Sequence, residues 1–151
     1  MAETATTSPK VPVSPALTMV LQARALETRI EEALQPLDLS LRKLGILGHL
    51  RATPGLSFSA LARRAGIKVQ SLHPIVDALT NAGYVRTVGE VSQGRSAALE
   101  LTDVGADAIQ DAYHALSEID QAVFAEGDWA VLGETLSRIA ASFLRRAAGG
   151  E

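Results

Sequence analysis

Basic, amide and hydroxyl side chains gather between Leu56 and Leu101, in an order that suits contact with a polyanion. The set consists of Arg63, Arg64, Lys68, Gln70, Ser71, His73, Arg86 and Arg95. Lysine and arginine neutralise phosphates, which positions a protein on a duplex without reading its sequence. Glutamine pairs bidentately with adenine, and serine contacts a base or a phosphate. For the cationic residues a solvated surface is an equally good interpretation, and we favour phosphate contact mainly for Arg95 and Lys68.

Two short helices are expected to position these residues. The first runs from about Ser57 and stops at Gly66. The second has one apolar face and closes at Asn81-Ala82-Gly83, where glycine adopts the left-handed conformation without a Cβ penalty. That face has residues at i, i+3, i+4 and i+7, namely Leu72, Ile75, Val76 and Leu79.

A hairpin is expected after these helices. Two strands, over residues 84–88 and 97–101, flank a polar tip at residues 92–96. Two helices followed by a hairpin with a basic tip form a winged helix-turn-helix, a module that places one helix in the DNA major groove. In that arrangement Gln70, Ser71 and His73 lie at the exposed N-terminal end of the second helix.

The charge distribution supports this interpretation. The chain has 151 residues and a net charge of −3. Residues 56–101 hold five basic and three acidic residues, a net +2, whereas the remainder carries −5. Binding phosphate requires a local positive surface rather than a basic total.

Catalytic and metal chemistry have little support. The absence of cysteine excludes disulfides, thiol nucleophiles and cysteine zinc sites, and favours a cytoplasmic protein. His49, His73 and His114 have no neighbouring ligands at metal-site spacing. No phosphate-binding glycine loop, nucleophile elbow or carboxylate pair occurs. We therefore expect no enzyme activity, catalytic residue, metal or cofactor. Because the sequence has no long apolar run and no signal pattern, we expect a protein that is neither inserted into a membrane nor exported.

Helices are expected on both sides of the module. Residues 1–13 predict a disordered tail, and Ser14-Pro15 a helix start for residues 14–34. A second helix starts after Ser40 and ends near Arg51. Thr102 is expected to cap the first of two further helices, both with heptad-like apolar spacing. Together with residues 14–36, these helices, over residues 102–148, are expected to form a dimerisation region. Residues 37–101 form the DNA-binding domain. The alternative is a monomer whose terminal helices pack only on themselves.

Several motifs in this order resemble the MarR family of bacterial transcriptional regulators, over residues 14–145. They are Leu37-Asp38-Leu39-Ser40, Leu61-Ala62-Arg63-Arg64-Ala65-Gly66-Ile67, Ile75-Val76-Asp77-Ala78-Leu79, Asn81-Ala82-Gly83-Tyr84-Val85-Arg86 and Leu99-Glu100-Leu101-Thr102-Asp103-Val104-Gly105. The resemblance implies a mainly α fold with a small β-hairpin, a winged helix-turn-helix flanked by N- and C-terminal dimerisation helices. It also implies a homodimer that represses a pseudo-palindromic operator and leaves DNA when a small aromatic or phenolic ligand binds.

Three features depart from the family pattern. The tip Gln93-Gly94-Arg95-Ser96 lacks the usual aspartate beside its arginine, although Arg95 can still enter a narrow minor groove. Pro74 stands where relatives commonly have a basic residue, and a proline inside a helix costs about 3 kcal/mol. We therefore expect a late start, with Ser71 as N-cap, or a kink. The missing cysteine excludes the peroxide-sensing branch.

By analogy with the family, an effector pocket is expected between the dimerisation helices and the module. Arg24, Lys43, His49 and Tyr113 are the polar candidates, although a structural role is the more ordinary interpretation of each. Pro74 and the thin wing also motivate an alternative function, a winged-helix dimer that serves as a protein-interaction module without operator binding. A dimerisation domain detached from an enzyme such as a methyltransferase finds no supporting motif.

Overall fold

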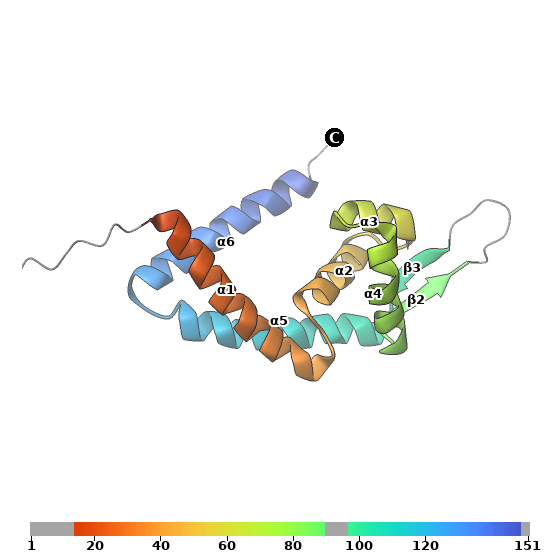
Figure 1. Cartoon of the computed structure of the whole chain (residues 1–151), viewed down its shortest axis with the longest axis horizontal. Coiled ribbons are helices and arrows are strands. Elements are labelled where there is room, and N and C mark those ends of the chain that lie inside the picture. The colour runs from red at the N-terminus through yellow and green to blue at the C-terminus, as the bar shows by residue number, and fades with distance from the viewer. Residues whose placement is uncertain (1–13, 90–96, 149–151) are drawn as a thin grey trace, which may run out of the picture.

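A computed structural model of the chain describes residues 14–89 and 97–148, the last five of them by their backbone alone. This part of the chain contains six α-helices, one 3₁₀ turn and three short strands (Figure 1). They are α1 Pro15–Leu34, η1 Gln35–Leu37, α2 Leu41–Ala52, β1 Leu56–Ser57, α3 Phe58–Ala65, α4 Val69–Asn81, β2 Val85–Val88, β3 Ala98–Leu101, α5 Asp103–Val123 and α6 Gly127–Ala148. The predicted mainly α fold with a small β element is confirmed. The predicted tail at residues 1–13 and the hairpin tip at 92–96 lie outside the described residues.

Hydroxyl side chains fix the starts of three predicted helices. Ser14 accepts a hydrogen bond from the Leu17 amide, and Ser40 accepts one from Lys43. Thr102 accepts one from Gly105. Each bond satisfies an amide that the first helical turn leaves without a partner. The predicted caps at all three positions are confirmed.

The expected two-stranded hairpin is part of a three-stranded antiparallel sheet with the order β1-β3-β2. Val85 pairs with Leu101 and Val88 with Ala98, as expected of a hairpin. The sequence analysis missed β1, in which Leu56 pairs with Leu99 and Ser57 with Ala98. This strand has only two residues and pairs with a segment some forty positions away, so no local sequence pattern predicts it.

The expected late start of the second module helix is wrong. α4 begins at Val69, and Ser71 and Pro74 both lie inside it. The Lys68 carbonyl accepts from the Ser71 amide at 3.0 Å and from the Leu72 amide at 3.2 Å, so the chain is already helical before Ser71. This start puts the Leu72 side chain, which has no exposed surface, into the core. The alternative, a kink at Pro74, stays a prediction.

The core lies mainly within the module. Its fully buried leucines come from four helices and one strand, and are Leu34, Leu47, Leu50, Leu61, Leu72, Leu79 and Leu99. α5 adds Ala108, Ile109 and Ala112, which bind the module to the long helices. The predicted apolar face of α4 is therefore confirmed at Leu72, Val76 and Leu79, while Ile75 is half-buried.

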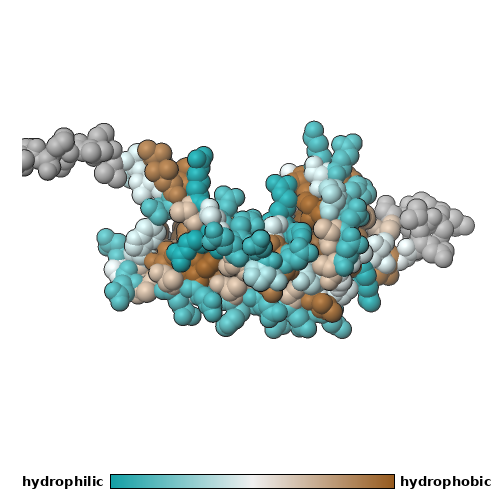
Figure 2. Space-filling view, turned by 60° about the horizontal axis from the view of Figure 1, so that its bottom comes forward, coloured by the Kyte–Doolittle hydropathy of each residue, from teal (hydrophilic) through white to brown (hydrophobic). Residues whose placement is uncertain are grey.

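The terminal helices are arranged differently. α1 packs across α5, whereas α6 turns back after Gly127 and runs from the far end of α5 toward the side of the molecule where the module lies (Figure 1). Large apolar side chains remain exposed on both helices. They are Leu17, Met19, Val20, Leu21, Trp129, Val131, Leu132, Leu136, Ile139 and Phe143. Figure 2 shows apolar surface at the end of the molecule where α1 begins. Among the described residues, no helix combines the length and hydropathy that crossing a membrane requires.

Candidate nucleic-acid interface

A tight turn sets the angle between α3 and α4. Gly66 ends α3 with a left-handed φ of 67°, a conformation that favours glycine. Its amide donates to the Arg63 carbonyl, and the Ile67 amide donates to the Ala62 carbonyl. These two bonds satisfy the last carbonyls of α3 and redirect the chain, so that α4 begins three residues later.

The outward side of α4 is polar at its N-terminal end. Lys68, Gln70, Ser71 and His73 are all exposed, while Leu72 between them is buried. The helix therefore anchors one face in the core and presents the other to solvent, as a helix that enters a groove requires. The structure brings these four predicted residues together on one short segment.

His73 also makes a contact within the protein. Its ring stacks on Phe58 of α3, with the ring centroids 4.6 Å apart and the planes inclined by 20°. An imidazole held in this way offers its edge, while one of its two faces is occupied. The contact also fixes the N-terminal half of α4 against the start of α3. The sequence does not predict this role of Phe58, because the pair depends on how the two helices cross.

The two arginines of α3 differ in their surroundings. Both are exposed at the C-terminal end of the helix. Arg64 donates to the Thr53 hydroxyl at 2.7 Å and thus reaches back to the end of α2. Partial burial first, and the nearby Arg64 charge second, lower the pKa of His49 below its ordinary value of 6.5. Arg64 is therefore oriented toward α2, whereas no hydrogen bond in the described structure directs Arg63.

Arg86 is held by an acidic neighbour. Arg86 and Glu100 lie opposite each other in the β2–β3 pairing, and the guanidinium contacts the carboxylate at 2.9 Å. Both side chains are at the surface, where such pairs contribute at most about 1 kcal/mol. A phosphate would have to compete with Glu100 for this arginine. Arg95 lies outside the described residues.

The two ends of the module meet at Tyr84. The tyrosine hydroxyl donates to the Leu37 carbonyl at 2.8 Å, where the chain enters the module. At the exit, the Thr102 amide donates to the Tyr84 carbonyl at 3.0 Å, and the Thr102 hydroxyl donates to the Gly83 carbonyl. Three hydrogen bonds therefore tie Leu37 and Thr102 to the same turn.

Gly105 lets α5 approach this turn closely. A Cβ at this position would lie 2.2 Å from the Tyr84 carbonyl oxygen, which is far inside van der Waals contact. Glycine is therefore required here by space rather than by backbone conformation. In the sequence Gly105 is visible only as part of a family motif, and nothing local to it indicates this role.

The four candidates for an effector pocket do not converge. His49 lines a cleft of about 410 Å³ between α1, α2 and the end of α3. Tyr113 lines a separate hollow with Leu44 and Ile109. Lys43 donates to the Asp38 carbonyl at 2.7 Å and pairs with its carboxylate, and Arg24 is exposed on α1.

The His49 cleft has three further polar residues, which were not among the predicted pocket residues. They are Glu27 and Glu31 from α1 and Arg42 from α2. The Glu31 carboxylate accepts from the Leu41 amide at 3.1 Å, at the positive end of the α2 dipole. Apolar walls come from Leu41, Ile46 and Ile67. Helical spacing places Glu27 and Glu31 on one face, but without the fold nothing pairs them with α2.

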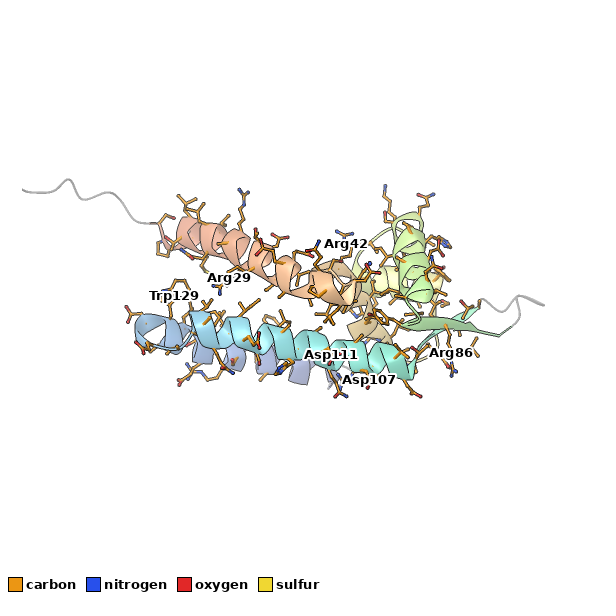
Figure 3. All side chains as sticks on the ribbon, turned by 90° about the horizontal axis from the view of Figure 1, so that it is seen from below. Arg29, Arg42, Arg86, Asp107, Asp111 and Trp129 are labelled. Carbon is orange, nitrogen blue, oxygen red and sulfur yellow. The ribbon has the colours of Figure 1, made fainter. Side chains whose placement is uncertain are left out.

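Two labelled residues mark how far the sheet lies from the start of α6. Arg86 is at the sheet, and Trp129 is at the opposite end (Figure 3). Within the described ranges, no group of three or more histidine, aspartate or glutamate side chains is placed to hold a metal ion.

Comparisons with known proteins relate the chain to one family. Residues 37–96 match the model of the MarR family. Helix-turn-helix-type transcriptional repressors of Mycobacterium bovis and Mycobacterium tuberculosis are 38% identical over 80 residues, which make up 53% of this chain and 58% of each repressor. The aligned segment thus spans little more than half the length of these relatives.

Solved structures share the fold. Wild-type MarR from E. coli in its apo form has a TM-score of 0.68 at 16% identity, over 86% of this chain and 98% of that chain. The M. tuberculosis regulator MosR has a TM-score of 0.56 at 23% identity, over 87% and 96%. A mutant of S. aureus MepR bound to an oligodeoxyribonucleotide has a TM-score of 0.63 at 14% identity, over 87% and 99%.

Proposed function

The chain belongs to the MarR family, and from that membership and the geometry of α4 we propose that it is a homodimeric transcriptional repressor that binds double-stranded DNA. The observation that carries the proposal is the exposed N-terminal half of α4. It combines Gln70 and Ser71, which can contact base edges, with Lys68 at the helix start. Arg63 is exposed at the end of the preceding helix. Phosphate contacts from these cations would set the position, and the helix would read the bases.

The apolar surface of the terminal helices supports a second copy of the chain as partner. Val131 and Phe143 on α6 are each 63% exposed, and Met19 on α1 is 64% exposed. Monomeric proteins rarely leave contiguous apolar surface of this kind uncovered. In a symmetric dimer the two α4 helices would enter successive major grooves about 34 Å apart, and the operator would be pseudo-palindromic.

The first experiment measures DNA binding with fluorescence anisotropy. Duplexes are selected from a randomised library, and the DNA beside the chain's own gene is tested with them. We expect two inverted half-sites and an affinity that falls steeply with salt, because each phosphate contact releases a counterion. A flat salt response, or no preference over random duplex, overturns the proposal. It favours the alternative in which the module binds proteins instead of DNA.

The oligomeric state is measured by sedimentation at micromolar concentration. We expect a dimer for the wild type and a monomer for Ile139→Glu, because a carboxylate in an apolar interface loses its hydration. Thr80→Glu on α4 is the control, since that residue is exposed and polar and lies outside the terminal helices. A wild-type monomer at high concentration contradicts the dimer.

For the effector we propose a small aromatic or phenolic molecule in the His49 cleft. A phenolic hydroxyl could donate to the Glu27 carboxylate, and the ring could lie against Ile46 and Ile67. The cleft joins α1 to α2 and α3, so a ligand there contacts both the dimerisation helices and the module.

The effector is tested by adding phenol or 4-hydroxybenzoate to the protein–DNA complex. We expect release from DNA in the wild type and less release in Glu27→Gln. The control is Tyr113→Phe, which alters a separate hollow and should respond as the wild type does. Equal release in all three proteins contradicts this location.

A further inference from the structure

The exposed face of α4 contains a ridge of four residues that lies opposite the core. Leu72, Val76 and Leu79 point inward and are at most 2% exposed. With 3.6 residues per turn, the residues on the opposite side are Gln70, Pro74, Asp77 and Asn81. All four are exposed. We call them the groove ridge.

The groove ridge contains no cation. Lys68 lies at the helix start, His73 lies to one side against Phe58, and Ser71 lies on the other flank. An arginine or lysine that could pair with guanine is therefore absent from the ridge. Base recognition by the ridge would depend on the Gln70 and Asn81 amides, on the Asp77 carboxylate and on whatever Pro74 contacts.

Pro74 is the single apolar member of the ridge, and it follows Gln70 by one turn. Because proline has no amide hydrogen, it cannot donate to the Gln70 carbonyl in the usual helical bond. Its presence inside α4 runs against local helix preference. Residues that violate a local rule in this way are expected most often at functional sites.

The structure assigns Pro74 as a specificity-determining residue that contacts the methyl group of a thymine in the major groove. The inference rests on the proposed function. The thymine methyl is the one methyl group that base edges display there, and the nitrogen and oxygen atoms of those edges donate or accept hydrogen bonds. A proline ring can do neither. Placed against a polar base edge, it would remove water without replacing its hydrogen bonds.

Gln70 makes this contact more specific. It precedes Pro74 by one turn on the same side of the helix, so the two side chains would meet neighbouring base pairs. Glutamine pairs bidentately with adenine. The half-site read by the first two turns of α4 is therefore expected to present an adenine to Gln70 and a thymine methyl to Pro74.

The test uses uracil in place of thymine, which removes the methyl group and keeps the base pair. Each thymine of the selected operator is replaced in turn, in both half-sites. Loss of one buried methyl-sized group, about 0.8 kcal/mol, corresponds to roughly fourfold weaker binding for each half-site. We expect this loss at one position for the wild type and a smaller loss at that position for Pro74→Ala, because the alanine side chain is shorter and covers less of the methyl group.

Two variants serve as controls. Val69→Ala removes an apolar side chain that is 37% exposed at the start of α4 but lies off the ridge, and Asn81→Ala changes the far end of the ridge. Both should keep the uracil effect. Pro74→Ala adds a residue with a high helix propensity, so the variant is expected to fold.

The outcomes separate the inference from the proposed function. A chain that selects no duplex overturns both. A chain that selects an operator but binds all uracil duplexes equally overturns the inference alone. The same holds if the uracil effect persists unchanged in Pro74→Ala or disappears in Val69→Ala.

Discussion

The module over residues 37–101 and the helix α6 bury their apolar side chains to very different extents. Leu47, Leu50 and Leu61 in the module have no exposed surface, whereas Leu132, Leu136 and Ile139 on α6 are each about 40% exposed or more. Both segments contain leucine at helical spacing, so their sequences alone look alike. The difference shows that the module contributes most of the buried core, whereas α6 leaves a row of apolar side chains exposed, as the proposed dimer interface requires.

The largest expected effect is the replacement of a module leucine. Leu50→Ala should lower the free energy of unfolding by about 3 kcal/mol, because it removes contacts in a fully buried site and leaves a cavity. The loss should be the same at every protein concentration. Chemical denaturation followed by circular dichroism measures it.

Leu136→Ala on α6 is the matched comparison, at 40% exposure. Its effect should appear at high protein concentration, where the dimer forms, and fade on dilution, because association stabilises the folded chain by mass action. If both alanine variants depend equally on concentration, the distinction between the two regions fails.

Gly105→Ala should have the next largest effect. The new Cβ would collide with the Tyr84 carbonyl, and overpacking of this kind costs about 1–3 kcal/mol. Gly48→Ala in α2 is the control, since nothing lies within 4 Å of its Cβ position. Gly48→Ala should stabilise the protein by about 1 kcal/mol through helix propensity. Thermal melts of the two variants should therefore shift in opposite directions.

Lys68→Ala should weaken binding to all duplexes alike. Removing one phosphate contact should reduce the slope of log K against log salt by about 0.9. Arg29→Ala, a variant on α1 at a distance from α4, should leave the slope unchanged (Figure 3). Equal slopes for Lys68→Ala and the wild type would mean that Lys68 is solvated in the complex.

The smallest effect concerns pH. Because the pKa of His49 is lowered in the folded chain, the unfolded chain binds more protons as the pH falls through 6.5. The free energy of unfolding is therefore not reduced by His49 above this pH, and it decreases as the pH falls below it. Between pH 7.5 and 5.5, the melting temperature of His49→Gln should fall less than that of the wild type. The melting temperature of His114→Gln, a variant on the exposed side of α5, should fall by as much as that of the wild type.

The sequence predicted those elements that local chemistry determines. Ser14, Ser40 and Thr102 are caps whose hydroxyls act within three residues, and Gly66 and Gly83 end helices through their own backbone conformation. The start of α4 was missed because Lys68 makes no side-chain cap bond. There the helix start is set by burial of Leu72, a tertiary effect that overrides the local signal from Ser71 and Pro74.

The exposure of the first residues of α4 was predictable from the sequence, whereas the contacts between side chains of different elements were not. Gln70 and Ser71 follow from the helical pattern, and both are exposed as expected. The stacking of His73 on Phe58 depends on the crossing of two helices, and the Arg86–Glu100 pair depends on strand register. The polar wall formed by Glu27 and Arg42 depends on how α1 lies beside α2.

The bonds that hold Leu37 and Thr102 to the turn at Gly83 and Tyr84 have one more consequence. A segment whose entrance and exit share one anchor keeps its two ends together when it is moved, so an exchange has to preserve this anchor and the packing against Leu34 and Ile109. Transplanting residues 37–101 between the terminal helices of a relative should therefore transfer the choice of DNA sequence while leaving the choice of subunit partner behind.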